Sequence, residues 1–359
     1  KKKEKEKEKE KKEFMCVREV WGFKKVTIYI DLSSKKKYMK NFCTLFNAKY
    51  LPRGILLYKS LQKNVKNFHL YIFAFDELTL KYFKNKNYKN ITVISLKEFE
   101  DKELLKIKKT RTPTEYFWTC TGSTLIYLFK KFNLKDCVYV DSDIYFFSYP
   151  SSFFEKFKKY SCVITKHNYA REYDQSQTNG IYCVQFLYFK NDIIGKKILQ
   201  DWRKKCLKWC YNRIEKGKFG DQKYLDSWPK KFKKVFVTEH FGAGLAPWNL
   251  SKFEMQKTKS TFLITDKKTK KNYNLIFYHY HDFKYFSNHF FLGSYKIDAI
   301  LYNLIYKKYS TLYLKEIKKL KNNINFIDYD FSDSTGQGKM YIINLIKKIL
   351  HFRNLKIIK

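Results

Sequence analysis

The chain has 359 residues, of which 44% are apolar, and it carries a formal net charge of +40. This length and apolar content suit a globular protein with a sizeable core in one or two domains. The charge favours acidic partners such as nucleotides, nucleic acid or an anionic membrane surface. Because the lysines are spread along the chain rather than gathered into one stripe, however, nucleic-acid binding is not indicated.

The cysteines and the hydropathy exclude two further classes. Eight cysteines occur, but nowhere with the Cys-x2-Cys spacing of a zinc site. Most lie inside apolar runs, where a free thiol behaves as a small hydrophobe, and this usage argues for a reducing compartment. No signal peptide and no apolar run long enough for a membrane helix are visible. We therefore expect a soluble, cytoplasmic protein.

The pattern along the chain predicts an α/β fold. Residues 1–14 are dominated by Lys and Glu and have nothing to bury, so this segment is predicted to be disordered. From residue 41 onward, apolar strand-like runs alternate with helical patterns. Strands are expected at 42–46, 68–75, 91–96, 137–140, 162–165, 182–189, near 235 and at 275–280, and helices at 52–61, 114–132 and 192–214. This alternation predicts right-handed βαβ units and a mainly parallel sheet flanked by helices.

No repeat or linker divides residues 41–309, which are expected to form one domain, followed by a helical basic tail at 310–359. Residues 334–359 contain no Asp or Glu, and apolar residues recur there at helical spacing. A basic amphipathic helix of this kind can lie in the headgroup region of an anionic bilayer. The tail therefore predicts either peripheral contact with the inner membrane leaflet or a terminal helix docked on the domain.

Two acids, Asp141 and Asp143, follow the apolar run at 137–140. A short unbroken apolar run is typical of a strand buried on both faces, and the carboxyl ends of such strands are where open α/β sheets bind ligands. Side chains alternate with period two, so the two carboxylates point the same way and repel each other unless a cation lies between them. Mg²⁺ and Mn²⁺ prefer carboxylate oxygens and are completed by phosphate and water. The pair therefore predicts a metal–diphosphate site.

The acid pair is also compatible with a simple turn or with a phosphatase site. Asp-x-Asp after a strand occurs in plain turns, because Asp accepts hydrogen bonds from nearby backbone. Phosphatases of the haloacid dehalogenase type also place Asp-x-Asp after a strand, usually near the N-terminus, with Thr or Val two residues after the second acid. Here Tyr145 occupies that position well inside the chain, which disfavours this class.

Four segments are predicted to be loops at strand ends, namely residues 47–50, 141–143, 178–180 and 279–284. Taken together they resemble a nucleotide-sugar-dependent glycosyltransferase of the GT-A fold, similar to retaining glycosyltransferase family 8. The resemblance covers roughly residues 42–295, and its strongest parts are residues 138–143 and the late histidine cluster. It implies a Rossmann-like, mainly parallel sheet flanked by helices, with residues 41–309 as the catalytic domain.

The resemblance also implies a metal site with Mn²⁺ or Mg²⁺ as the cofactor. Asp141 and Asp143 match the family's metal-binding Asp-x-Asp, with the first acid also near the ribose of the sugar donor. His279 matches the late third metal ligand, and His is a usual ligand of Mn²⁺. His281 lies two residues further on and is the alternative ligand. Lys284 matches a lysine that neutralises the departing diphosphate.

Further site residues are implied in the same way. The implied residues that bind the sugar donor are Phe46, Asn47, Tyr50, Arg111, Asp141, Ser142, Asn179, Gly180 and Lys284. Asn47 and Tyr50 match positions that hold the nucleotide base by amide hydrogen bonds and by stacking. Asp221 and Gln222 resemble the catalytic acid–amide pair beside the reacting sugar, where the acid binds sugar hydroxyls and the amide carbonyl stabilises oxocarbenium-like charge.

The implied activity is a metal-dependent hexosyl transfer from a nucleotide-diphosphate sugar to a glycan or lipid-linked acceptor, with retention. A sugar nucleotidylyltransferase shares the core fold but needs a Gly-rich loop after its first strand, and residues 45–48 contain no glycine. A non-enzymatic, basic RNA- or polysaccharide-binding protein is the second alternative. It predicts metal-independent binding that salt weakens steeply, and it leaves the paired acids unexplained.

Overall fold

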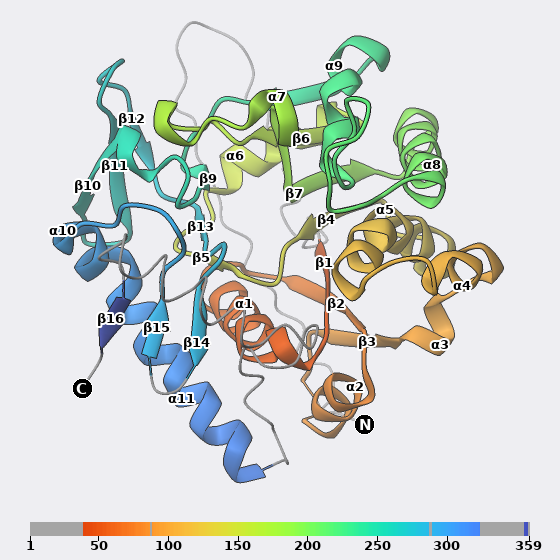
Figure 1. Ribbon diagram of the computed structural model, residues 1–359, viewed down its shortest axis with the longest axis horizontal. Helices are drawn as coiled ribbons and strands as arrows, with labels where there is room; N and C mark the ends of the chain where they lie inside the picture. The colour runs from red at the N-terminus through yellow and green to blue at the C-terminus, as the bar shows by residue number, and fades with distance from the viewer. Residues whose placement is uncertain (1–38, 87, 287–288, 324–354, 358–359) are drawn as a thin grey trace, which may run out of the picture. The chain divides into compact units, whose positions relative to one another are not determined.

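The computed structural model describes residues 39–86, 88–286, 289–323 and 355–357. Its centre is a seven-stranded sheet in the order β3-β2-β1-β4-β7-β6-β8, of which all strands except β8 are labelled in Figure 1. The strands are β1 (Lys40–Phe46), β2 (Phe68–Ala74), β3 (Ile91–Ser95), β4 (Asp136–Val140), β6 (Cys162–Lys166), β7 (Tyr182–Lys190) and β8 (Val235–Thr238). Only β7 runs antiparallel to its neighbours in this sheet. The predicted α/β fold class with a mainly parallel sheet is confirmed.

The central strands are apolar throughout because both faces of the sheet are covered. In β1, Phe42 and Phe46 enter one hydrophobic core, while Cys43 and Leu45 enter the core on the opposite face. The seven cysteines of the described residues are all free and buried, so they pack as small apolar side chains.

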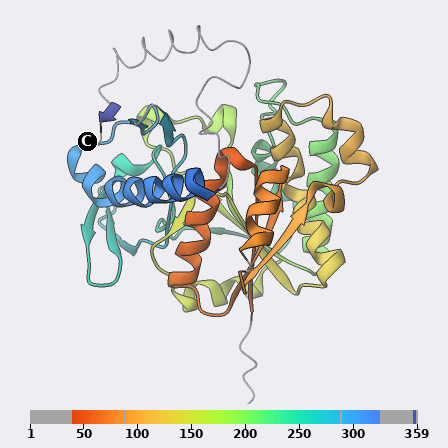
Figure 2. The ribbon, with the colours of Figure 1, turned by 90° about the horizontal axis from the view of Figure 1, so that it is seen from below.

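Helices cover both faces of the sheet (Figures 1 and 2). The first core contains side chains of α1 (Leu51–Asn64), α2 (Glu77–Asn85), α6 (Ser151–Glu155) and α11 (Lys307–Asn323). The second contains side chains of α3 (Leu96–Phe99), α4 (Lys102–Lys108), α5 (Pro113–Phe132), α8 (Ile193–Lys208) and α9 (Trp228–Lys231). Local sequence sets the helix starts: Thr112 and Glu115 form a capping box at α5, and the Asp192 side chain caps α8.

Three small sheets complete the described fold. They are β5 (Ile144–Phe146) with β13 (Phe277–His279) and β9 (Ala243–Leu245), β10 (Phe253–Lys257) with β11 (Phe262–Asp266) and β12 (Asn272–Asn274), and β14 (Lys284–Phe286) with β15 (His289–Phe291) and β16 (Leu355–Ile357). The remaining short elements are α7 (Ser176–Asn179), α10 (Ala299–Leu301), the single turns Ala48–Tyr50, Lys156–Lys159, Arg171–Tyr173, Gln222–Ser227 and Leu250–Lys252, and the π-helical Tyr302–Tyr306. In the first of these sheets β13 pairs antiparallel with β5, and His279 lies opposite Ile144. This pairing places His279 beside the Asp141–Asp143 segment.

One predicted helix is wrong in its length. The pattern predicts a helix over 192–214, but α8 ends at Lys208 and Trp209 adopts an extended conformation. Trp209 is anchored by its own contacts, because its ring N–H donates to Glu215 at 3.1 Å and its carbonyl accepts from the Tyr224 hydroxyl at 2.8 Å. These contacts hold the chain after Lys208 in a non-helical conformation.

The predicted tail begins inside a packed helix. Residues 310–323 belong to α11, whose Glu316 pairs with Lys59 of α1 at 2.5 Å. Tyr309 of the same helix stacks on Tyr280 at 3.5 Å between ring centroids. Of the rest of the tail, Leu355–Ile357 form β16 and pair with β15, and the other residues lie outside the described ranges. Within the described residues, no helix is both long and apolar enough to cross a membrane.

Candidate active site

A cavity of about 480 Å³ opens at the carboxyl ends of β1 and β4. Its walls include Leu45 and Phe46 from β1 and Tyr139 from β4, with Asp141 immediately after β4. The chain order of the sheet reverses between these two strands, since β2 and β3 lie beyond β1 while β7 lies beyond β4. Open α/β sheets bind ligands at such a switch point, so the cavity lies where the topology favours a site.

Three strands fix the backbone around the two acids. The Asp141 N–H donates to the Gln185 carbonyl of β7 at 3.0 Å, and the Ile144 N–H donates to the Asp141 carbonyl at 3.2 Å. The Tyr280 N–H, directly after β13, donates to the Asp143 carbonyl at 2.9 Å. A tight turn held in this way directs both carboxylates toward the cavity.

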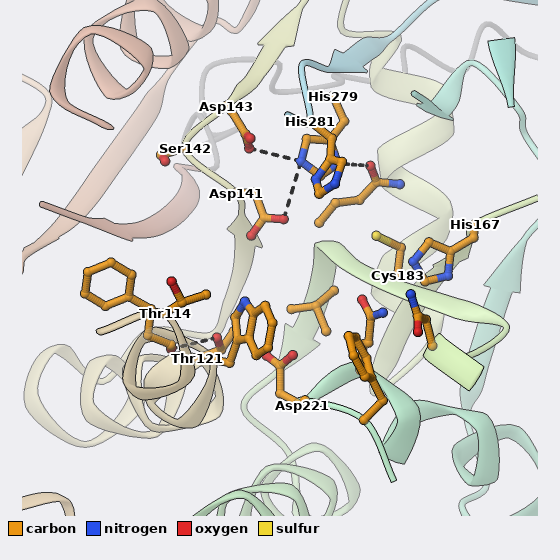
Figure 3. A pocket seen from close by; sticks show the side chains of 18 of the residues that line it. Thr114, Thr121, Asp141, Ser142, Asp143, His167, Cys183, Asp221, His279 and His281 are labelled. Carbon is orange, nitrogen blue, oxygen red and sulfur yellow. Dashed lines mark hydrogen bonds and ion pairs between the residues drawn. The ribbon is translucent and has the colours of Figure 1, made fainter. Parts of the chain in front are cut away.

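Asp141, Asp143 and His279 form one group (Figure 3), with their ligand atoms all within 4.8 Å of one another. His279 Nε2 lies 3.0 Å from Asp143 Oδ1 and 3.8 Å from Asp141 Oδ2. On the other side of the ring, Nδ1 lies 2.8 Å from the Gln185 side-chain oxygen. Because that oxygen only accepts, Nδ1 carries a proton, and Nε2 faces the two carboxylates. A lone pair facing two carboxylates requires a cation between them, either a proton or a metal ion.

The pKa values of Asp141, Asp143 and His279 also indicate that the site favours a positive charge. Burial raises the pKa of Asp141 to about 6, with a further contribution from the Asp143 charge. Burial also opposes ionisation of Asp143, but the neighbouring His279 outweighs it and lowers the pKa of Asp143 to about 2. Burial alone lowers the pKa of His279, yet Asp143 and Asp141 together raise it well above its ordinary value. Without a metal ion, a proton is therefore held between His279 and the two carboxylates.

The residues present fit a divalent metal ion. Two carboxylates and one imidazole make a mixed oxygen and nitrogen donor set suited to Mn²⁺, and carboxylates also suit Mg²⁺. The Gln185 oxygen holds the far side of the imidazole, and the Tyr139 hydroxyl donates to Asp141 Oδ1 at 3.0 Å, as supporting groups around metal ligands do. His281 lines the cavity but is exposed, its ring centroid lies 5.6 Å from that of His279, and it is outside the three-residue group.

The cavity brings together many of the predicted residues. Those that line it are Phe46, Tyr50, Asp141, Ser142, Asp143, Asn179, Asp221, Gln222, His279 and His281. Asp221 is buried, and its Oδ2 has no hydrogen-bond partner. Burial, followed by the charge of Asp141, raises the pKa of Asp221 to about 8. A carboxyl group that is protonated near neutral pH can donate a hydrogen bond to a ligand as well as accept one.

Four predicted residues lie outside the cavity lining. Asn47 has its side-chain oxygen buried without a partner, and Arg111 stacks on the Tyr211 ring at 3.9 Å. Lys284 forms an ion pair with Asp282 at 2.6 Å. Gly180 adopts φ +111° against the 222–226 turn, where a side chain would be strained. These four residues are outside the cavity lining, and their roles toward the sugar donor stay predictions.

Several residues that line the cavity were not predicted from the sequence. Gln185 is completely buried and touches His279, and its signal was a single amide within the apolar and aromatic run of β7. Asn212 and Phe219 reach the cavity only because α8 ends at Lys208, whereas the periodicity placed residue 212 inside a helix. His167 and Cys183 also line the cavity, and no spacing in the sequence marks them.

Comparisons with known proteins find related sequences and similar folds. No protein-family model matches the chain. Two proteins of Bacillus subtilis (strain 168), the uncharacterized proteins YfnD and YfnF, are each 28% identical to it. The match to YfnD spans 247 residues, which are 68% of this chain and 78% of YfnD. The match to YfnF spans 251 residues, which are 68% of this chain and 81% of YfnF.

Among solved structures, the galactosyltransferase LgtC in complex with donor and acceptor sugar analogues matches with a TM-score of 0.47 and 10% identity, over 77% of this chain and 95% of LgtC. The glycosyltransferase GlyE of Streptococcus pneumoniae TIGR4 matches with a TM-score of 0.43 and 12% identity, over 79% of this chain and 64% of GlyE. With TM-scores below 0.5, these similarities assign neither an activity nor a substrate to this chain.

Proposed function

We propose that the protein is a metal-dependent glycosyltransferase that moves a sugar from a nucleotide-diphosphate sugar to a glycan or lipid-linked acceptor. The observation that carries the proposal is the Asp141, Asp143 and His279 group at the switch point of the sheet, facing a cavity of about 480 Å³. The charge requirement of that group suits a divalent ion, which would supply positive charge to a diphosphate. Retention of configuration is part of the same proposal.

The proposal assigns a separate role to each of several residues that line the cavity. Asp141, Asp143 and His279 would hold a divalent ion, which would supply positive charge to stabilise the departing diphosphate. Phe46 and Tyr50, on the β1 side of the cavity, offer apolar and aromatic surface to the nucleotide base. Asp221, protonated near neutral pH, hydrogen-bonds a hydroxyl of the transferred sugar. Gln222 presents an amide whose carbonyl oxygen stabilises positive charge at the reacting carbon.

The protonation of Asp221 bears on stereochemistry. A retaining enzyme with a covalent intermediate needs an ionised carboxylate as the nucleophile. Asp221 has a pKa of about 8 and is therefore mostly neutral at pH 7. The proposed retention is thus compatible with attack by the acceptor hydroxyl on the face that the diphosphate leaves.

A screen of donors tests the activity. The protein is incubated with sugars activated by UDP, GDP, CDP or dTDP, each with Mn²⁺ and with EDTA, and release of nucleoside diphosphate is measured. We expect release with one nucleotide class, dependent on the metal. Pyrophosphate release from a nucleoside triphosphate and a sugar phosphate would instead indicate a nucleotidylyltransferase. Metal-independent binding of RNA or polysaccharide that falls steeply with salt would indicate the binding protein.

The two histidines are expected to differ as metal ligands. His279→Ala removes a donor atom that faces both carboxylates, whereas His281 is outside the three-residue group. We expect His279→Ala to weaken Mn²⁺ binding about 10- to 100-fold and His281→Ala to change it less than about threefold. Titration with Mn²⁺ in the presence of UDP measures both. The reverse order would transfer the third ligand to His281.

The basic tail is the reason for proposing an acceptor that is lipid-linked or lies near a membrane. Lys347 and Lys348 lie in its acid-free stretch, and each lysine near an anionic surface contributes about 1 kcal/mol of attraction. Replacing both by Glu is expected to reduce co-sedimentation with phosphatidylserine vesicles at low salt. The matched control replaces Lys267 and Lys268, on the β11–β12 turn, by Glu. Equal vesicle binding by the wild type and the tail variant would contradict peripheral attachment through the tail.

A further inference from the structure

Gln185 contacts two of the three residues in the proposed metal site. Its carbonyl accepts the Asp141 N–H at 3.0 Å, and its side-chain oxygen lies 2.8 Å from His279 Nδ1. The residue is in β7, between β4 and β6 in the central sheet, and its side chain is completely buried. A single residue of β7 is thus in contact with the segment after β4 and with the end of β13.

The side chain of Gln185 is not explained by packing. Its neighbours along β7 are Val184, Phe186 and Leu187, so the local pattern calls for an apolar residue. Its amide nitrogen is buried without a hydrogen-bond partner, which is a cost to the folded state. The one interaction that its side chain gains among the described residues is the hydrogen bond with His279. The hydrogen bond with His279 is therefore the interaction that accounts for an amide at this position.

That role follows from the chemistry of imidazole. A neutral imidazole has one protonated nitrogen, and the hydrogen bond at one nitrogen decides which electron pair is available at the other. The Gln185 oxygen accepts only, so it keeps the proton on Nδ1 and leaves Nε2, which faces Asp141 and Asp143, for a metal ion. It also fixes the ring orientation, because the bond is made in a fully buried setting.

We propose that Gln185 is a positioning residue that fixes the metal-binding tautomer and orientation of His279. The inference rests on the proposed function for the identity of the bound group, a divalent ion, but not on any sugar transfer. Gln185 itself does not touch the ion. Its backbone contact with Asp141 persists in every side-chain variant, so substitutions test the histidine contact alone.

Two substitutions separate positioning from packing. Gln185→Leu keeps the approximate volume and removes the acceptor, whereas Gln185→Glu keeps an oxygen acceptor at the same reach. We expect Gln185→Leu to weaken binding of Mn²⁺ alone about 10- to 100-fold, and Gln185→Glu to stay within about threefold of the wild type. Isothermal titration and the electron paramagnetic resonance signal of free Mn²⁺ measure these affinities. Nitrogen-15 and proton spectra of metal-free protein are expected to show a hydrogen-bonded Nδ1–H of His279 in the wild type, and this hydrogen bond is expected to be lost in Gln185→Leu.

Thr165→Val is the matched control. Thr165 is buried in the adjacent strand β6, pairs in register with Cys183, and also has a side-chain oxygen without a partner, but it is outside the cavity lining. We expect this variant to bind Mn²⁺ as the wild type does. Equal weakening by Thr165→Val and Gln185→Leu, or unchanged Mn²⁺ binding in Gln185→Leu, would overturn the positioning role. Wild-type protein that binds Mn²⁺ but transfers no sugar from any donor would refute the proposed activity and leave this inference standing.

Discussion

Replacing Asp143 by Asn is expected to reduce metal-dependent transfer, or hydrolysis of the sugar donor, by about a thousandfold or more. Asp143 has a pKa of about 2, so it is fully ionised at neutral pH, and its Oδ1 lies 3.0 Å from His279 Nε2. An Asn side chain fills the same space but removes the negative charge that holds a cation. The backbone contacts of residue 143 are unchanged by the substitution. We expect Asp141→Asn to have a comparable effect.

The variants are compared with Asp201→Asn, which alters an acid on α8 that pairs with Lys205 and Lys231 at the surface. Nucleoside diphosphate release is measured with saturating Mn²⁺, and thermal melting checks that each variant is folded. Activity in the control is expected to equal that of the wild type. If both Asp141→Asn and Asp143→Asn kept full activity, the acid pair would be a turn without a metal role.

The part of the fold that could be predicted is the part governed by local pattern. The run at 137–140 is apolar because β4 is buried on both faces, and the acids follow it at the sheet edge. Asp192 and Pro52 mark helix starts by their own chemistry. Such signals depend on neighbouring residues only, and the sequence contains them in full.

The part that could not be predicted depends on contacts between distant segments. His279 reaches Asp143 only because β13 pairs with β5, a register that no local pattern encodes. Trp209 ends α8 through contacts with Glu215 and Tyr224, so helical periodicity overran the true end. Gln185 appeared as one polar residue in an apolar strand, which signals an unusual role but not its partner. The late histidines were identified by resemblance rather than by geometry.

The second large effect is expected at Asp221, where Asn should stabilise the metal-free protein increasingly as the pH rises. The folded-state pKa of about 8 lies above the ordinary value of 3.8, because burial and the Asp141 charge disfavour ionisation. The unfolded chain releases this proton near pH 4, so wild-type stability falls between about pH 4 and 8. At about 1.4 kcal/mol for each pKa unit, the loss is on the order of 5 kcal/mol by pH 8. Asn at position 221 does not ionise, so the variant does not lose this part of the unfolding free energy.

Urea unfolding of both proteins in EDTA, from pH 5 to pH 8.5, measures this difference. The free energy of unfolding of Asp221→Asn relative to wild type is expected to grow with pH across that range, while Asp201→Asn shows no such trend. At the same time Asp221→Leu, which removes both the donor and the acceptor, is expected to lower transfer about 100-fold or more, whereas Asp221→Asn, whose neutral amide also donates and accepts, is expected to lose far less. Activity that survives in Asp221→Asn but not in Asp221→Leu would support a protonated Asp221 at the sugar. A difference in unfolding free energy that stays constant with pH would mean that Asp221 ionises normally, and the protonated role proposed for it would fail.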